Sequence, residues 1–594
     1  MAAHMNDRSQ TANVLGISAP GHHSTAALLQ DGLITAAIED QKLLRVDSSY
    51  LPEAAMHFCL EHAGVEWKDL DAVSIATRPI GGWIRRSWNR TKLLPRAPLA
   101  SVYHLANELS TLAKGLKDLR RLRAEYGRAG EWQYFDHHLC HAAAAFYQSP
   151  FDRALIFILD ENGDGYSGAV ALGTETGIRV LRRIEFPNSL AWVYSRVTEL
   201  IGFTSHRDEH KTQWLGLEGE PLYKQVFLEM LRDQHAPFLR LNRKYVDRSL
   251  AQRLDFSERF FAETRLPKNV SLDEYQRRCL ARSIQEAFVE LITDLAEFFR
   301  RRLEVKRVCF AGGLFQNSVL VASLERSLGP ADVFVPPAPG NAGTAVGAAF
   351  LGWHRNHTRP RVGATVNAFG GPNFTNQEVK DVLDNCKSRY SIQATEDRKL
   401  DATVQLLRKG KIVGWFQGQC EFGPRALGNR SVLASPWASY VKENLNDYIK
   451  FREWFRPFAI SVPEEDCARY FECSRSCRYM NSMGWVQPGV TCVPPAFILP
   501  GGRVRLHIVE QSVNPLFWKL LKRFGEQAPA PMLVNTSFNL FGEPLIAAPR
   551  DAVRSYFCSG LDGLVINNFL LCKDGSAFTK RDAQISKQVQ LQAQ

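Results

Sequence analysis

The chain has 594 residues, too many for one hydrophobic core, and we therefore expect at least two domains. Its balance of 45% hydrophobic and 23% charged residues excludes a disordered or fibrous protein, and no run approaches the roughly 20 apolar residues of a membrane span. The net charge of +11 favours anionic ligands, either nucleic acid or phosphorylated small molecules.

The chain opens with three predicted strands at 14–18, 24–30 and 33–39. Asp31-Gly32 between the second and third is a strong hairpin signal. The same order returns in strands predicted at 155–160, 166–173 and 178–184. A repeated unit of this kind indicates duplication. We therefore predict an α/β fold with a duplicated ribonuclease-H-like core, in which two polar turns face a phosphate-binding cleft.

A short histidine-rich segment, Asp136-His137-His138-Leu139-Cys140-His141, precedes an alanine run. Asp136 is a good helix N-cap, and the alanines favour a helix. In that helix His137 and His141 are four residues apart and leave the same face. Two such imidazoles can hold one divalent metal. A capped helix with core or solvated histidines is the alternative interpretation.

Two glycine-rich loops lie further along the chain. Gly312 and Gly313 follow a strand predicted at 307–310, and the loop 336–343, which contains Asn341, leads into a helix predicted at 344–353. Glycines in this position let backbone amides approach a nucleotide or a sugar. The pattern alone is a weak signal for such a site.

A linker predicted at 354–368 leads to a second domain, which we expect to begin near Phe369. Basic residues gather on its glycine-punctuated loops, together with hydroxyl and amide groups. The basic residues are Arg425, Arg430, Lys450, Arg452 and Arg456, and the polar ones lie at 535–539. Arginine forks and lysine point charges suit a polyphosphate or an acyl phosphate. Surface salt bridging is the alternative for any single residue, whereas the set predicts a phosphate site.

Several segments carry a resemblance to a known family. They are DHHLCHAAAAF, FAGGLFQN, PGNAGTAVGAA, GWFQGQCEFGPRALGNRS, KFREWFRPFAISV and NTSFNLFGEPLI. The chain resembles, from about 13 to 575, the O-carbamoyltransferases of antibiotic and nodulation-factor biosynthesis, the NodU/CmcH family.

The resemblance implies two domains and two chemical steps. Residues 13–355 would form an actin/Hsp70-like domain, similar to tRNA threonylcarbamoyl-transfer enzymes, with the metal and acceptor sites. Residues 369–580 would form a YrdC-like domain. That domain would convert carbamoyl phosphate and ATP, with Mg²⁺, to carbamoyl-adenylate. The first domain would then pass the carbamoyl group to a hydroxyl of a small natural-product acceptor.

The family's motifs also imply roles for individual residues. Arg425, Lys450, Arg456, Ser537 and Asn539 match residues that bind the phosphates and the carbamoyl group, Arg425 and Lys450 acting in catalysis. We add Arg430, Asn535, Gly312 and Gly313 to the predicted substrate and ATP site. His137, His141 and Asp160 match metal ligands, usually of iron, with Asn341 at the fourth position. His22 matches the general base that takes the proton of the acceptor hydroxyl.

The chain departs from the family's pattern at several positions. Asn341 stands where the family has an aspartate, and a neutral amide is a weaker ligand for a hard cation. His23 follows His22 in place of an aspartate. The family's Glu-Glu-Arg-Phe run reads differently at 39–43, and the Lys-His pair after it is missing. We therefore expect adenylate formation to be retained, and the acceptor or the transfer step to differ.

Other readings remain open at this point. The adenylating half could serve another nucleophile or another acyl phosphate, or the chain could be a nucleotide-binding protein that has lost catalysis. The basic charge also allows a tRNA modifier, but no RNA-binding module is visible, so we do not expect nucleic acid as a partner. Hydrogenase-maturation carbamoylation is disfavoured, because an acylphosphatase segment and paired CxxC motifs are missing. The twelve cysteines have no paired spacing, which predicts a cytoplasmic protein.

Overall fold

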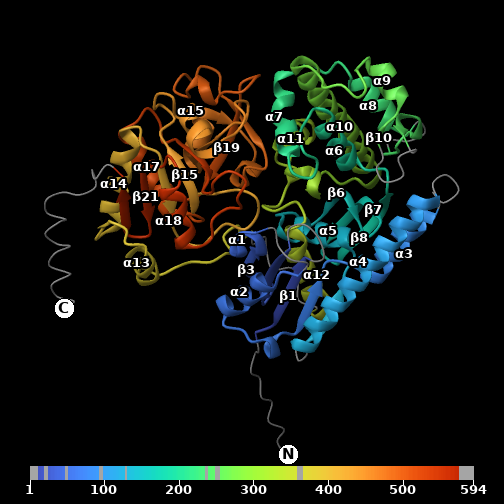
Figure 1. Ribbon diagram of the computed structural model, residues 1–594, viewed down its shortest axis with the longest axis horizontal. Helices are drawn as coiled ribbons and strands as arrows, with labels where there is room; N and C mark the ends of the chain where they lie inside the picture. Colours follow the sequence, from blue (N-terminus) through green and yellow to red (C-terminus); the bar gives the residue numbers. More distant parts are fainter. Residues whose placement is uncertain are drawn as a thin grey trace, which may run out of the picture.

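A computed structural model describes residues 11–18, 24–46, 51–91, 98–126, 130–233, 238–247, 255–357 and 366–573. The predicted base His22, with His23, lies outside these ranges. Figure 1 shows the two halves of the chain side by side, the first in blue to green and the second in orange to red.

The first sheet has the strand order β3-β2-β1-β4-β5. Its members are β1 (Asn13–Ser18), β2 (Thr25–Gln30), β3 (Leu33–Glu39), β4 (Ala72–Ile75) and β5 (Glu131–Tyr134). β1, β2 and β3 pair antiparallel, and β4 and β5 add parallel to β1. The hairpin predicted at Asp31-Gly32 is present, with both residues at positive φ.

The second sheet repeats this arrangement. Its members are β6 (Ala154–Gly163), β7 (Tyr166–Thr174), β8 (Gly177–Glu185), β11 (Val308–Ala311) and β12 (Val333–Phe334). β6 pairs antiparallel with β7, β7 pairs antiparallel with β8, and β11 and β12 add parallel to β6. The strand order and the strand directions match those of the first sheet, which confirms the predicted duplicated ribonuclease-H-like core.

Two helices pack between the sheets and hold the histidine segment. Alanines of α5 (His137–Gln148) and α12 (Gly343–Asn356) share one core with strands of both sheets. These small side chains let the backbones approach closely, and a Cβ on Gly347 of α12 would lie 1.8 Å from the Cys140 carbonyl oxygen. The Asp136 carboxylate caps α5, as predicted, by accepting from the Leu139 amide at 3.1 Å. The first turn of α5 is therefore fixed in place.

Other helices of this half cover the sheets or form a separate lobe. α2 (Glu53–Ala63), α3 (Pro79–Thr91) and α4 (Pro98–Glu125) precede β5. The lobe inserted between β8 and β11 shares one core with β6, β7 and β11, and contains α6 (Leu190–Leu200), α7 (Glu209–Leu215), α8 (Lys224–Leu231), α9 (Glu258–Thr264) and α10 (Glu274–Leu303). No helix in the described ranges has the length and apolar character to cross a membrane.

The second half is built on one mixed sheet of ten strands. In sheet order they are β13 (Ser391–Ile392), β22 (Phe569–Cys572), β21 (Gly563–Ile566), β14 (Val413–Phe416), β15 (Arg430–Ala434), β20 (Leu533–Ser537), β16 (Ala459–Pro463), β19 (Arg503–Val509), β18 (Met483–Val486) and β17 (Phe471–Glu472). Helices α14 (Glu396–Arg408) and α17 (Pro515–Gly525) contribute to one core, and α13 (Asn376–Asn385) and α18 (Pro549–Phe557) to another. The predicted α/β fold class is confirmed.

Candidate active site between the two halves

Three predicted metal ligands lie together where α5 meets β6. The Asp160 Oδ2 atom is 3.2 Å from His137 Nε2 and 3.5 Å from His141 Nε2. All three ligand atoms lie within 4.8 Å of one another, the only such group of His, Cys, Asp or Glu in the described part of the chain. Two ligands about 2.0–2.2 Å from one ion lie about 3 Å apart, so this spacing suits a metal.

Orphaned polar atoms around this triad fit a cation as well. Both ring nitrogens of His141 are buried without a hydrogen-bond partner, and so is Asn341 Oδ1. A buried amide oxygen with no donor is costly, because it has lost its water and gained nothing. Two imidazoles, one carboxylate and one amide oxygen form a donor set that a divalent ion such as Fe²⁺ accepts.

Asp164, in the polar turn between β6 and β7, holds the base of α5. Its carboxylate accepts from the His137 amide at 3.0 Å and from the Thr77 hydroxyl at 3.0 Å. Gly163 beside it admits the His137 ring, since a Cβ there would lie 2.1 Å from His137 Cδ2. The second of the two predicted polar turns therefore orients a histidine of the triad.

The glycine loop after β11 links the triad to the second half of the chain. The Gly313 amide donates to Asp160 Oδ1 at 3.3 Å. Gly312 has a φ of 104°, and a Cβ on it would lie 2.2 Å from the Leu159 carbonyl oxygen, so only glycine fits. Three residues after Gly313, the Gln316 carbonyl accepts from Arg425 Nη2 at 2.9 Å. One short turn therefore touches both the triad and a predicted phosphate ligand.

A cluster of five cations lies on the second half and faces the first, and we call it the basic cluster. Its members are Arg425, Lys450, Arg452, Arg456 and Arg505. Burial, followed by repulsion from Arg456, lowers the pKa of Arg425 to about 10. Burial and neighbouring arginines also hold the pKa values of Lys450 and Arg505 well below their usual ranges. Buried like charges disfavour their own ionised forms, so this cluster is built for an anion.

Residues at the end of β20 and just after it hold the Lys450 ammonium group in place. Its Nζ donates to Asn539 Oδ1 at 2.7 Å, to the Asn539 carbonyl at 3.1 Å and to the Ser537 carbonyl. Ser537 Oγ donates to Asn539 Oδ1 at 2.8 Å. The structure thus brings together three residues that lie up to 89 positions apart in the chain.

Arg430 and Asn535 occupy different surroundings from those predicted. The Arg430 guanidinium is fully buried, stacks 3.6 Å from the Phe416 ring centroid, and donates to the carbonyls of Gln417 and Pro372 at 2.7 and 2.9 Å. Asn535 is also buried and donates to Ser461 Oγ at 3.1 Å. Arg430 therefore braces the loop that carries Arg425, because its two terminal nitrogens donate to backbone carbonyls, and its predicted contact with the substrate stays a prediction.

The same loop is held by a fully buried carboxylate, Glu421. Its Oε1 accepts from the amides of Leu427, Asn429 and Arg430 at 2.7, 2.9 and 3.1 Å. We expect Glu421→Ala to lower the free energy of unfolding by about 3 kcal/mol or more, because three amides lose their acceptor. Urea denaturation measures this loss. Glu421→Gln keeps an acceptor oxygen and should lose less, and equal stability of the alanine variant would contradict this account.

Two further residues were missed as site residues by the sequence reasoning. Arg505 on β19 lies 5.4 Å from the Trp214 ring of α7 and repels Arg425. His210 lies four residues before Trp214 on α7, hence on the same face. Its Nε2 is buried without a partner, while its Nδ1 lies 3.1 Å from the Arg207 carbonyl. Neither residue could be found from the sequence, because a strand residue and a lone histidine carry no motif.

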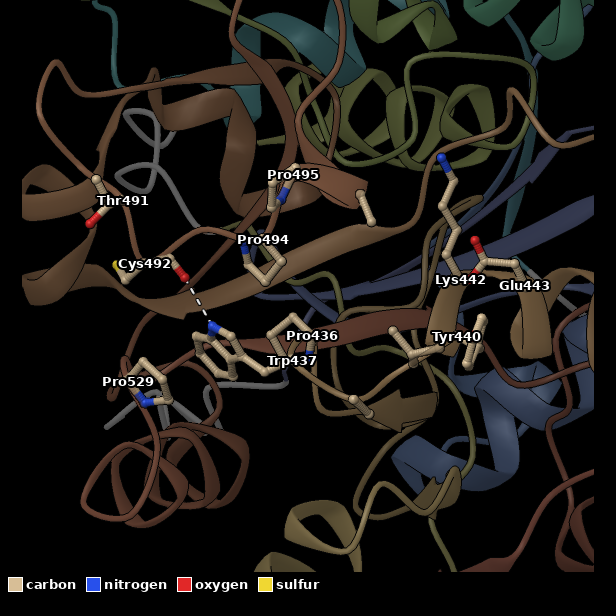
Figure 2. Close-up of a pocket in the computed structure, with 13 residues that line it drawn as sticks. Pro436, Trp437, Tyr440, Lys442, Glu443, Thr491, Cys492, Pro494, Pro495 and Pro529 are labelled. Atoms are coloured by element: carbon tan, nitrogen blue, oxygen red, sulfur yellow. Dashed lines mark hydrogen bonds between the residues drawn. The ribbon is translucent and has the colours of Figure 1, made fainter.

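A separate hollow of about 510 Å³ lies on the second half, away from these residues. Trp437, Tyr440 and several prolines line it (Figure 2), and Trp437 Nε1 donates to the Cys492 carbonyl at 2.9 Å. Its lining contains no member of the basic cluster or of the triad. Volume alone therefore does not mark the site where the charged groups converge.

Comparisons with known proteins show the family to which the chain belongs. The family model described as Carbamoyltransferase N-terminus matches residues 13–350, and Carbamoyltransferase C-terminus matches 404–573. The uncharacterized protein sll1178 of Synechocystis is 30% identical over 98% of this chain and 100% of its own length. Nodulation protein NolNO of Sinorhizobium fredii is 31% identical over 93% of this chain and 79% of its own.

Two further proteins match parts of the chain. The 3'-hydroxymethylcephem-O-carbamoyltransferase of Amycolatopsis lactamdurans is 31% identical over 40% of this chain and 43% of its own length. Among solved structures, HypF of T. kodakarensis aligns over 58% of this chain and 48% of its own, with 14% identity and a TM-score of 0.33. From the two family models, which together span both halves, the chain belongs to the carbamoyltransferase family and is a transferase.

Proposed function

We propose that this chain is an ATP-dependent O-carbamoyltransferase that works through carbamoyl-adenylate. The observation that carries the proposal is the basic cluster, one buried lysine and four partly buried arginines, of which Arg425 donates to the Gln316 carbonyl in the turn next to the triad. Glu453 is the nearest counterion, and it already pairs with Lys211 at 2.7 Å and Arg456 at 3.6 Å. The remaining positive charge suits the phosphates of ATP and carbamoyl phosphate.

The first chemical step consumes one water molecule. Carbamoyl phosphate and water give carbamate and phosphate; a carbamate oxygen then attacks the α-phosphorus of ATP, and pyrophosphate leaves with its bonding electron pair. Negative charge builds up on the transferring phosphate oxygens. Arg425, Arg456 and Lys450 would supply fixed positive charge there, from side chains that are buried or partly buried. Mg²⁺ would accompany ATP, as in other nucleotide-dependent enzymes.

The second step would take place at the triad. The acceptor oxygen bonds to the carbamoyl carbon, AMP leaves, and the hydroxyl proton goes to a base, for which we propose His22. His137, His141, Asp160 and the Asn341 amide would hold a divalent metal, which when bound supplies Lewis-acid stabilisation of negative charge. We propose a small-molecule hydroxyl as the acceptor. We propose a cytoplasmic location, because the twelve cysteines of the sequence have no paired spacing.

We further propose that His210 selects the carbamoyl group. Burial, followed by repulsion from Arg456 and, more weakly, from Arg425 and Lys211, lowers the pKa of His210 to about 3 against the opposing effect of Asp208. The ring is therefore neutral at pH 7. Because Nδ1 faces a backbone carbonyl, it carries the proton, and Nε2 is left as a pure acceptor. This position suits an anion that also carries an N–H group to donate to His210 Nε2. Carbamoyl phosphate is such an anion, because its carbamoyl group ends in NH₂.

We expect His210→Ala to lower discrimination between carbamoyl phosphate and acetyl phosphate by about tenfold, because the NH₂ group loses its acceptor. AMP formation with each acyl phosphate, compared as kcat/KM, measures the ratio. His206→Ala is a matched control, since His206 is an exposed histidine paired with Glu161 at 3.0 Å. Unchanged discrimination in His210→Ala would exclude the proposed contact.

The proposed function is tested by trapping the intermediate. The chain is incubated with ATP and carbamoyl phosphate, and hydroxylamine is added to intercept carbamoyl-adenylate as hydroxyurea. We expect AMP and hydroxyurea in equal amounts, each dependent on carbamoyl phosphate. Formation of ADP, or AMP that does not depend on carbamoyl phosphate, would show that the activated intermediate is a different one.

A further inference from the structure

The short helix α1 (Asp40–Leu44) of the first half lies against two loops of the second half. It follows β3 directly, and the Asp40 amide donates to the Ser24 carbonyl at 3.0 Å. This segment is also where the sequence at 39–43 departs from the family's pattern. Lys42 of this helix and Arg45, its C-cap residue, make contacts with the second half.

Lys42 fixes the loop that carries Arg425. It is a buried residue, and its Nζ donates to the carbonyls of Glu421 and Gly423 at 2.8 and 2.7 Å and pairs with Glu39 at 2.8 Å. An ammonium group has three protons, so every one has an acceptor. Glu39 Oε1 in turn accepts from the Gly423 amide at 3.0 Å. Gly423 is therefore held at both its N–H and its C=O, two residues before Arg425.

Arg45 fixes the loop that aims Lys450. Its Nη1 donates to the Pro544 and Leu545 carbonyls at 2.7 and 2.9 Å, and its Nη2 pairs with Glu543 at 2.7 Å. The Glu543 carbonyl accepts from Asn539 Nδ2 at 2.7 Å. Asn539 is the side chain that accepts from Lys450, so only Glu543 and Asn539 separate Arg45 from the lysine.

We infer that Lys42 and Arg45 are positioning residues for the phosphate site, and that the first half of the chain completes the geometry of the second. The inference rests on the proposed function, because it treats the basic cluster as a phosphate site. We assign neither Lys42 nor Arg45 a direct contact with a substrate. They act through Gly423 and Asn539, whose placement sets where the charges of Arg425 and Lys450 lie.

The test compares full-length Lys42→Met, Lys42→Arg and Arg45→Lys with the wild type. Two readouts are measured: binding of pyrophosphate by calorimetry, and exchange of pyrophosphate into ATP in the presence of carbamoyl phosphate. Lys42→Met and Arg45→Lys should weaken pyrophosphate binding and lower the exchange kcat, each about tenfold, because displaced charges are lost from the site. Lys42→Arg keeps the charge and should recover part of both.

Glu325→Gln is the matched control. Glu325 on α11 (Ser318–Leu328) is a buried carboxylate that crosses between the halves and accepts from Ser474 and Ser476 at 2.7 and 2.6 Å, but it touches neither loop. It should lower the melting temperature and leave both readouts unchanged. The inference would be overturned if Lys42→Met and Arg45→Lys bound and exchanged pyrophosphate as well as the wild type does. It would also be overturned if Glu325→Gln lost as much binding and exchange as they do. If Lys42→Met fails to fold, Arg45→Lys alone decides it.

The two proposals fail in different ways. A wild type that binds pyrophosphate without exchanging it would contradict the adenylate mechanism, while the binding series would still decide the roles of Lys42 and Arg45. A wild type that exchanges, with variants that exchange equally well, would overturn only the positioning inference.

Discussion

Replacing Arg425 with alanine should lower carbamoyl-phosphate-dependent exchange between pyrophosphate and ATP by about 10²–10³-fold, the usual cost of removing one fixed group that stabilises developing charge. Arg425 is half-buried and is repelled by Arg456, and although its partial burial lowers its pKa to about 10, it remains charged at pH 7. A desolvated charge interacts strongly with a phosphate oxygen, because little water screens it. Incorporation of ³²P into ATP by wild type and variant measures the loss.

Two control variants separate this role from general loss of charge. Arg478 is a partly exposed arginine of the same half, paired with Glu510 and Glu464. Arg478→Ala should exchange at the wild-type rate. Arg425→Lys keeps the charge but loses the fork that reaches the Gln316 carbonyl, and should fall between alanine and wild type. Exchange in Arg425→Ala at the wild-type rate would remove Arg425 from the proposed site.

Replacing His141 with alanine should reduce bound divalent metal to less than one-tenth of the wild-type content. His141 is fully buried, and its Nε2 lies 3.5 Å from Asp160 Oδ2, so no water-exposed group can take its place. The measurement is metal analysis of purified protein after dialysis against ferrous iron under reducing, anaerobic conditions. Asn341→Asp should bind the metal more tightly, because a carboxylate replaces a neutral amide oxygen.

His138→Ala is the control for this experiment. His138 lies on the same helix and is equally buried, but it is not a member of the triad. It should keep the wild-type metal content. Metal content that is unchanged in His141→Ala, or lost equally in His138→Ala, would contradict the assignment of the triad.

Much of the fold could be predicted because its signals are local. Asp136 and the alanine run predict α5 and its cap, since both act within a few residues of the chain. The repeated strand pattern predicts the duplicated sheets, because hydrophobic periodicity and the Asp31-Gly32 turn are read directly from neighbouring residues. The pairing of His137 with His141 follows from their spacing on one helix, whereas Asp160 is added only by the family resemblance, and the structure places all three together.

The features that could not be predicted from the sequence depend on contacts between distant segments of the chain. Arg430 resembles Arg425 in sequence context, yet its guanidinium is fully buried, because it donates to the carbonyls of Gln417 and Pro372, which are distant in the sequence. His210 belongs to the site only because α7 faces the other half. Likewise, the contact from Lys42 to Glu421 joins residues 379 positions apart, and no periodicity in the sequence encodes that distance.

The most direct test of the central claim is exchange of ³²P-pyrophosphate into ATP by the wild-type chain, with and without carbamoyl phosphate. Adenylate formation at the basic cluster predicts exchange that requires carbamoyl phosphate. No exchange with carbamoyl phosphate, in protein that still binds ATP, would contradict the claim and leave a nucleotide-binding protein without this chemistry.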